Sequence, residues 1–262
     1  MSDDRPVTRI GSAHARTDIL TMRGLDTLTD IVGARSFTET FYFIVTGRMP
    51  DAAQTKCFDA CLTVLMDHGL TPSAMTARLT EHSVPEDMQV SVAAGLLHVA
   101  NRHVGTMAGA GRLLAEAQAA GGDARAWAAR TASRFQAQKR RVPGFGHPHY
   151  FPEDPRAARL FAVADAAGCG GGAIALIKIL SEEVDRAFGR HLTLNVTGAM
   201  AAVLTEIGFP VEAMRGVAIV SRAAGLVAHI YEEKQMGLSG PLLHMADEAF
   251  TPDATKAGEA AE

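Results

Sequence analysis

The sequence predicts an all-α protein, and three observations lead to that prediction. Apolar residues recur at helical spacing in segments that glycine and proline separate. No segment alternates apolar and polar residues for long enough to form a half-buried strand. Alanine is abundant and aromatic residues make up only 6% of the 262 residues, which suits helices packed closely together.

The first two helices carry clear start and stop signals. Ser36 and Glu39 have the spacing of a capping box, and Gly47 with Pro50 ends the helix that follows. A second helix is expected over residues 51–69. Further helices are expected at 72–78, 86–99, 105–119, 123–138, 155–167, 173–188, 196–207 and 211–236.

The composition predicts a cytoplasmic protein with one large domain, or with one large and one small domain. Hydrophobic residues make up 47% of the chain, and the formal net charge of −4 provides no basic field for nucleic acid. The polar start does not resemble a signal peptide, and no apolar run reaches the ~20 residues of a membrane span. The tail after Phe250 is expected to be frayed or disordered.

The three cysteines are too few and too scattered for a disulfide framework or a zinc site. Cys57 and Cys61 lie one helical turn apart, so we expect both thiols in or near the core.

The segment from Val142 to Asp154 is the most informative part of the chain. It contains Pro143-Gly144-Phe145-Gly146, and the two glycines allow the backbone to approach a ligand closely. An alternative interpretation is a connector rich in proline and glycine, with incidental charges nearby.

Charged and titratable residues flank these glycines. His147 can donate to a carbonyl or exchange a proton near neutral pH. Arg156 opens the next helix and can bind a carboxylate through two hydrogen bonds. Arg140 and Arg141 lie just upstream, where they can meet phosphates.

The stretch PGFGHPHYFPEDPRA (143–157) resembles the active-site segment of citrate synthases and citryl-CoA lyases, which reads P-G-F-G-H, a short spacer and D-P-R. Other segments resemble the same family in the same order, so that the likeness covers about residues 8–245. These segments are 36–50, 66–78, 93–114, 194–210 and 221–233.

The resemblance implies a large helical domain and a smaller one that close on the substrate. The large domain would comprise 1–103 and 209–262, and the small domain 104–208. It also implies a homodimer or a dimer of dimers, coenzyme A as the acyl carrier, acyl-CoA such as acetyl-CoA as a substrate, and no metal.

Site residues follow from the matching positions. His103 would stabilise a thioester enolate, and His147 would polarise a keto carbonyl in synthesis or take a hydroxyl proton in cleavage. The polycarboxylate would be held by His68, Arg156 and Arg222. Coenzyme A would lie along Arg140, Arg141, Pro143, Gly144, Phe145 and Gly146. The alternatives are a helix-end role for His68, a packing role for His103 and a buried structural role for Arg222.

The pattern departs from the family at the catalytic aspartate, which is Thr197 here, in Asn195-Val196-Thr197. A neutral hydroxyl cannot take a proton from a thioester methyl group, and the loss of a well-placed base typically costs ~10²–10⁴-fold in rate. The family's His-Gly-Gly-Ala reads His-Val104-Gly-Thr, and the stretch 236–241 lacks the arginine that members contribute to their partner's site.

Other groups near Thr197 in the sequence offer weaker candidates. Glu182, Glu183 and Asp185 are expected to form a solvated helix face, and His191 is a weaker candidate for a base. The glycine run 168–172 lacks the strand and helix context of a phosphate-binding motif, so we interpret it as a turn.

The combined pattern predicts a carbon–carbon lyase or synthase that acts on a CoA thioester of a hydroxy polycarboxylic acid, most similar to citryl-CoA lyase and favouring cleavage. One alternative is a catalytically weak relative that binds a CoA thioester or polycarboxylate in a regulatory role. Another is a helical structural subunit of a larger complex.

Overall fold

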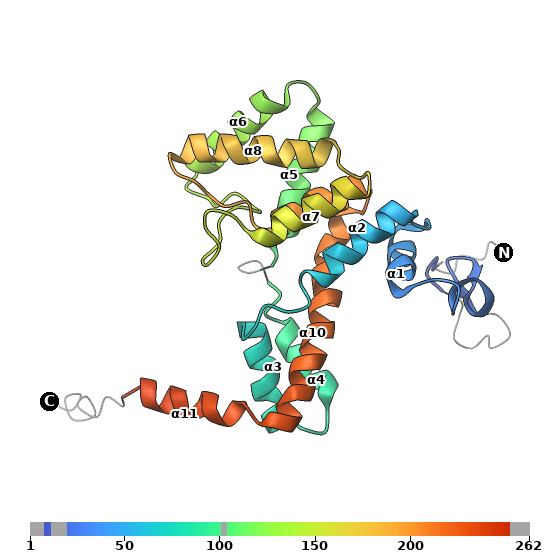
Figure 1. Ribbon diagram of the computed structural model, residues 1–262, viewed down its shortest axis with the longest axis vertical. Coiled ribbons are helices and arrows are strands. Elements are labelled where there is room, and N and C mark those ends of the chain that lie inside the picture. Colours follow the sequence, from blue (N-terminus) through green and yellow to red (C-terminus); the bar gives the residue numbers. More distant parts are fainter. Residues whose placement is uncertain (1–7, 12–19, 101–103, 252–262) are drawn as a thin grey trace, which may run out of the picture. The chain divides into compact units, whose positions relative to one another are not determined.

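The computed structural model describes residues 8–11, 20–100 and 104–251, and it confirms the all-α prediction. The chain forms two compact units, each built from separate stretches of sequence (Figure 1). The first unit comprises Met1–Val64 and Asn101–Ala218, and the second comprises Leu65–Ala100 and Ile219–Glu262. The predicted small domain, 104–208, lies within the first unit, and its boundaries stay a prediction.

Most helices belong to the first unit. They are α1 (Phe37–Thr46), α2 (Ala52–Thr63), α5 (Thr106–Ala120), α6 (Ala124–Ala137), α7 (Pro155–Ala166), α8 (Gly172–Phe188) and α9 (Val196–Glu206). Short pieces complete this unit: the antiparallel strands β1 (Thr21–Met22) and β2 (Leu25–Asp26), a π-helix at Thr27–Ile31 and a 3₁₀ turn at Val211–Ala213. The second unit contains α3 (Pro72–Ser83), α4 (Met88–Leu96) and α11 (Ser239–Ala249), and α10 (Met214–Met236) begins in the first unit and continues in the second.

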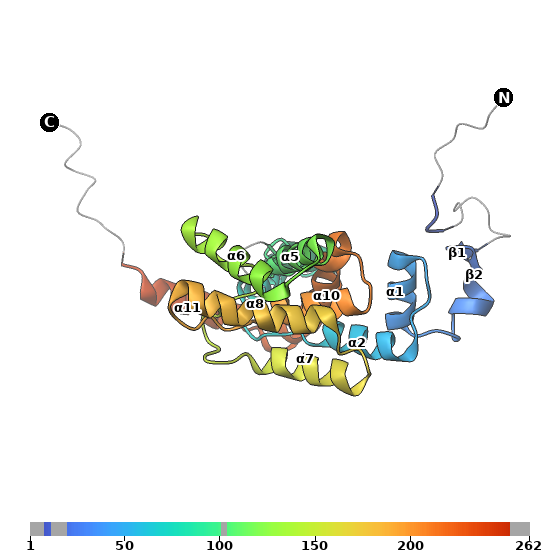
Figure 2. The same ribbon diagram turned by 90° about the horizontal axis from the view of Figure 1, so that it is seen from above.

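The buried helix α9 is the centre of the first unit. Every residue from Val196 to Leu204 is buried, and α9 packs against α2, α5, α7 and α8. Five of these nine residues are glycine, alanine or threonine, so the neighbouring helices can come close to its backbone. Figures 1 and 2 show α6, α8 and α7 side by side in that order within this unit.

Helix starts agree well with the sequence signals. Ser36 and Glu39 form the expected capping box, and Asp51 forms a second one with Gln54.

Cys57 and Cys61 are buried, as predicted, at 1% and 0% exposure. Burial also raises the pKa of the Cys57 thiol to about 12.

Two helix ends differ clearly from the predictions, and one helix was missed. The helix α2 ends at Thr63 rather than near Gly69. The Asp67 carboxylate binds the backbone N–H of Gly69 and the ring of His229, and these contacts hold the segment outside a helical turn. The helix α3 continues to Ser83, and its Glu81 is buried and accepts a hydrogen bond from Ser91. The helix α11 was not predicted.

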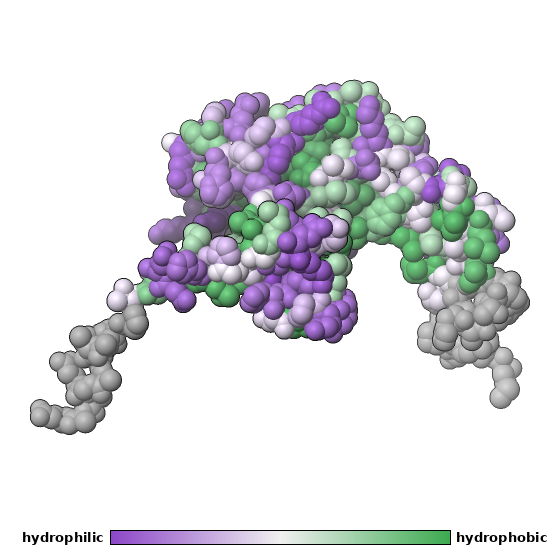
Figure 3. Space-filling view, turned by 60° about the horizontal axis from the view of Figure 1, so that its bottom comes forward, coloured by the Kyte–Doolittle hydropathy of each residue, from purple (hydrophilic) through white to green (hydrophobic). Residues whose placement is uncertain are grey.

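Apolar side chains remain exposed on the N-terminal part of the first unit. Leu28, Val32 and Phe37 are 62%, 64% and 70% exposed, and Figure 3 shows apolar (green) surface on the right-hand side of that view. Among the described residues, one helical stretch, Val211–Met236, is long and apolar enough to cross a membrane by length and composition alone, with 44% of its most apolar window buried in the structure. Core helices of water-soluble proteins meet the same criterion, so this is weak evidence for a span.

The second unit has an apolar core crossed by an ionic cluster. Ala74, Ala77, Leu226 and Ile230 are fully buried where α3 meets α10. Arg78, 1% exposed, pairs with Glu233 at 3.2 Å, with Glu232, and with Nδ1 of His229 at 2.8 Å. Because both Arg78 and Glu233 are buried, each charge depends on the other.

Replacing Arg78 by methionine is expected to lower the free energy of unfolding by about 3–5 kcal/mol, because it leaves the Glu233 carboxylate buried without its cation. Urea unfolding measures the change. The matched control is Arg134→Met, whose ion pair with Glu116 is half exposed (45% and 47%) and is expected to contribute at most about 1 kcal/mol. Equal losses in the two variants would contradict the importance of burial.

Candidate active site

The predicted active-site loop between α6 and α7 pairs with the segment that precedes α9. The backbone N–H of Gly146 donates to the carbonyl of Thr193 at 2.7 Å, and that of Asn195 donates to the carbonyl of Gly144 at 3.0 Å. Phe145 and Leu194 lie between them as an antiparallel bridge. The loop is therefore fixed directly to the start of α9.

Two glycines allow this close contact. Gly144 has a φ of +88°, and a Cβ atom added there would lie 2.8 Å from the Cα of Gly198. A Cβ atom on Gly198 would lie 2.7 Å from the carbonyl oxygen of Gly144. The sequence suggested that the backbone at Gly144 approaches a ligand closely. In the structure, the backbone at Gly144 closely approaches α9.

Asn195 caps α9 and also holds the loop. Its Oδ1 accepts hydrogen bonds from the backbone N–H groups of Thr197 (3.1 Å) and Gly198 (3.2 Å). Its Nδ2 donates to the carbonyl of Gly146 at 2.9 Å. These partners leave only one orientation for the side-chain amide.

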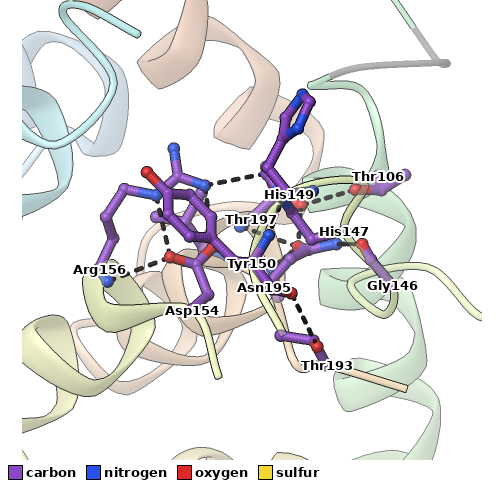
Figure 4. Close-up of polar contacts among 12 residues, drawn as sticks. Thr106, Gly146, His147, His149, Tyr150, Asp154, Arg156, Thr193, Asn195 and Thr197 are labelled. Atoms are coloured by element: carbon purple, nitrogen blue, oxygen red, sulfur yellow. Dashed lines mark hydrogen bonds and ion pairs between the residues drawn. The ribbon is translucent and has the colours of Figure 1, made fainter. Parts of the chain in front are cut away.

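Thr197 occupies the aspartate position and belongs to a chain of hydroxyl groups (Figure 4). Its Oγ1 lies 2.7 Å from Asn195 Oδ1 and 2.6 Å from Thr106 Oγ1. An amide oxygen only accepts, so Thr197 donates to Asn195 and Thr106 donates to Thr197. The chain ends at an amide that takes no proton near neutral pH, and therefore it supplies no general base.

The buried carboxylate of Asp154 joins α7 to α9. It accepts hydrogen bonds from Nε (2.9 Å) and Nη2 (2.8 Å) of Arg156, and from the backbone N–H of Val196 at 2.9 Å. Burial opposes ionisation of this carboxyl group, but the hydrogen bonds and charge of Arg156 outweigh it, so the pKa of Asp154 lies below its ordinary value. Asp154 therefore fixes the plane of the Arg156 guanidinium.

His147 is oriented by the backbone of its own loop. Its Nδ1 accepts hydrogen bonds from the N–H groups of His149 (3.1 Å) and Tyr150 (3.0 Å), so the proton of the neutral ring lies on Nε2. Nε2 is 3.3 Å from Nη2 of Arg156, and because a guanidinium only donates, this contact places two donors side by side when the proton lies on Nε2. The ring of Tyr150 lies 4.6 Å from that of His147, and the Arg156 guanidinium lies 4.7 Å from the Tyr150 ring centre.

Figure 4 shows His147 and Arg156 beside each other, with Tyr150 and Asp154 next to them. The assigned tautomer makes the facing nitrogens of His147 and Arg156 two adjacent donors. Two such donors suit one carbonyl, alkoxide or carboxylate oxygen of a ligand. Tyr150, Asp154, Asn195 and Thr106 were not among the predicted site residues. The N-cap position of Asp154 before Pro155-Arg156, and of Asn195 before α9, is the sequence signal that could have identified two of them.

The other predicted residues are spread over both units. His103 lies outside the described residues. His68 lies in an exposed turn of the second unit, and Arg222 of the same unit is buried, with its Nη1 3.4 Å from Thr71 Oγ1. The structure brings together His147, Arg156 and Thr197, whereas a place for His68 and Arg222 beside them stays a prediction.

The predicted coenzyme A residues fall into two groups. Arg140 and Arg141 are exposed, and the Arg140 guanidinium lies over the ring of Phe135 at 5.4 Å. Phe145 is buried, and Pro143 packs against Gly109, where an added Cβ would lie 2.8 Å from the proline ring. The first group is therefore exposed, whereas the second is buried at Gly144 and Phe145 and partly buried at Pro143 and Gly146.

Two interpretations of nearby residues are settled by the structure. The expectation of a solvated face is wrong for Glu183, which is 3% exposed and pairs with Arg125 and Arg186. The glycine run 168–172 is a turn, as predicted, and the carboxylate of Glu206 binds the backbone N–H of Ile174 at the start of α8. That helix start already has its anion.

Replacing Gly198 by alanine is expected to lower the free energy of unfolding by about 1–3 kcal/mol, because the new methyl group would overlap the Gly144 carbonyl. Chemical denaturation measures this loss. The control is Gly216→Ala in α10, where an added Cβ meets nothing within 4 Å, so that the variant should be as stable as the parent or more stable. A Gly198→Ala variant of unchanged stability would contradict the tight loop contact.

Comparison with known proteins gives a consistent family. The family model for the citrate synthase C-terminal domain matches residues 7–241. A citryl-CoA lyase from Hydrogenobacter thermophilus is 33% identical and has a TM-score of 0.79, covering 87% of this chain and 86% of its own. The ATP citrate lyase of Methanothrix soehngenii, solved with citrate and coenzyme A, shares the fold (18% identity, TM-score 0.73, 88% of this chain and 39% of its own).

The citrate synthase of Haloferax volcanii is 29% identical over 74% of this chain and 50% of its own length. The chain thus spans about half the length of the curated relatives it matches. The family model covers most of the chain, including the loop and the start of α9, and on this basis the chain belongs to the citrate synthase family.

Proposed function

We propose that this chain is a carbon–carbon lyase or synthase of the citryl-CoA lyase type, acting on a CoA thioester of a hydroxy polycarboxylic acid. The observation that carries the proposal is the pair of adjacent donors, His147 Nε2 and Arg156 Nη2, held in place by Asp154 and the loop backbone. The 33% identity with a citryl-CoA lyase over most of both chains supports the same reaction class.

The proposed cleavage begins at the substrate hydroxyl. Its proton passes to water or to a carboxylate of the substrate, the bond between the hydroxyl carbon and the thioester methylene breaks, and the electron pair forms a thioester enolate. The hydroxyl carbon becomes a keto carbonyl. The enolate then takes a proton to give the methyl thioester, and the reverse sequence is the synthesis.

His147 acts on the oxygen of this hydroxyl or carbonyl. Because Nδ1 accepts two backbone hydrogen bonds, the neutral ring donates from Nε2, which stabilises an alkoxide in cleavage and polarises a carbonyl in synthesis. Arg156 adds a second donor and its positive charge. Taking the hydroxyl proton itself would require the other tautomer, so in our proposal His147 acts as the donor.

In our proposal, Thr197 does not exchange the proton of the thioester carbon. The hydroxyl of Thr197 donates to Asn195 and accepts from Thr106. We propose that water or a carboxylate of the substrate carries that proton. His103 would stabilise the enolate, as the family resemblance implies.

Coenzyme A would bind beside the loop, with its phosphates near the exposed Arg140 and Arg141. Further carboxylates would be held by His68 and Arg222. We propose a cytoplasmic homodimer or dimer of dimers without a metal. The exposed side chains of Leu28, Val32 and Phe37 are of the kind that a subunit interface covers.

The test is turnover of citryl-CoA and related hydroxyacyl-CoA thioesters by the purified protein. His147→Ala is expected to lower kcat by about 10²–10³-fold, the effect of removing one oxyanion donor. The control is His244→Ala, whose side chain on α11 is 75% exposed and which should keep wild-type activity. A folded protein that binds these thioesters without turning any of them over would instead indicate a regulatory binder.

A further inference from the structure

His191 joins the candidate active-site loop to α8 through both of its ring nitrogens. Nδ1 lies 2.6 Å from Oδ2 of Asp185, and Nε2 lies 2.7 Å from the carbonyl oxygen of Pro152. Neither partner can donate, since one is a carboxylate and the other a carbonyl. Both nitrogens must therefore carry a proton, and the geometry is that of an imidazolium.

The surroundings of His191 stabilise its charged form. Asp185 is itself fixed, since its Oδ1 accepts the backbone N–H of Leu192 at 2.8 Å. Glu153, on the loop, adds a second negative charge, and the Phe151 ring lies 5.6 Å from the imidazole. The hydrogen bond with Asp185 is the largest of the influences that raise the pKa of His191, the hydrogen bond with Pro152 is the next, and burial opposes them.

The carbonyl that His191 binds belongs to the segment that positions His147. Thr193 Oγ1 lies 3.0 Å from the carbonyl of Tyr150 and 3.1 Å from that of Pro152. Tyr150 in turn donates its backbone N–H to His147 and packs its ring on it. Protonated His191 and Thr193 thus hold the segment that aims His147.

We propose that His191, with Asp185, is a pH-sensitive positioning residue: its protonated form fixes residues 150–152, and its deprotonation loosens the loop that orients His147. A neutral imidazole keeps only one of the two hydrogen bonds. The kinetic consequence rests on the proposed function, whereas the titration and the movement of Tyr150 do not.

The direction of the pH effect follows from the raised pKa. The stabilisation is fully present below the unfolded-state pKa of about 6.5 and is lost as pH rises through the higher folded-state value. Because His147 acts on the transition state, kcat should fall about threefold to tenfold over that range, the contribution of one hydrogen bond.

The structural arm of the test is a histidine NMR titration of the full chain. His191 should titrate above pH 6.5, and Asp185→Asn should lower that value. The ring signals of Tyr150, one of three tyrosines, should follow the same titration and should stop doing so in His191→Gln. The proposal would be overturned if His191 titrates at or below pH 6.5, or if the Tyr150 ring signals do not change with its titration. Both results can be read even if the protein shows no turnover.

The kinetic arm compares pH profiles of kcat for citryl-CoA. Glutamine has an amide N–H for the Pro152 carbonyl but does not titrate, so His191→Gln should remove the step in kcat. His244→Gln, on the exposed face of α11, should retain it. A step of the same size and at the same pH in His191→Gln would refute the role of His191. If the NMR titration is as expected but the protein shows no turnover, only the proposed function is refuted.

Discussion

The candidate site depends on the hydrogen bonds and the ion pair that the buried carboxylate of Asp154 makes. One carboxylate caps α7, binds the guanidinium of Arg156 on two of its nitrogens and accepts the first free N–H of α9. A carboxylate in this position would be costly without the arginine, and the arginine would be free to turn without the carboxylate. The direction of Arg156 is therefore determined before any ligand arrives.

The same junction explains why the donors of the site are well ordered while a base is missing. The backbone of the loop selects the His147 tautomer, and Asp154 selects the Arg156 orientation. At position 197 the side chain faces an amide oxygen and a second hydroxyl. The site is thus built to stabilise negative charge on oxygen, which is the part of the reaction that does not need the aspartate.

Local sequence signals predicted much of this structure. The capping box at Ser36, the start of α7 at Asp154-Pro155 and the position of the loop all depend on neighbouring residues, and they were found. The unwound end of α2 and the burial of Glu183 depend on partners far along the chain, such as His229 and Arg125. The contact between Gly144 and Gly198 could not be predicted for the same reason, because the two glycines are far apart in the sequence.

Thr197 is no base, and hydrogen–deuterium exchange into the methyl group of acetyl-CoA is the direct test of this. Thr197→Val, which removes the hydroxyl and keeps the shape, should exchange as slowly as the wild type. Thr197→Asp should exchange faster by about 10²–10⁴-fold, the contribution of a positioned base. Rapid exchange by the wild type that Thr197→Val abolishes would show instead that the Thr197 hydroxyl takes part in the proton transfer.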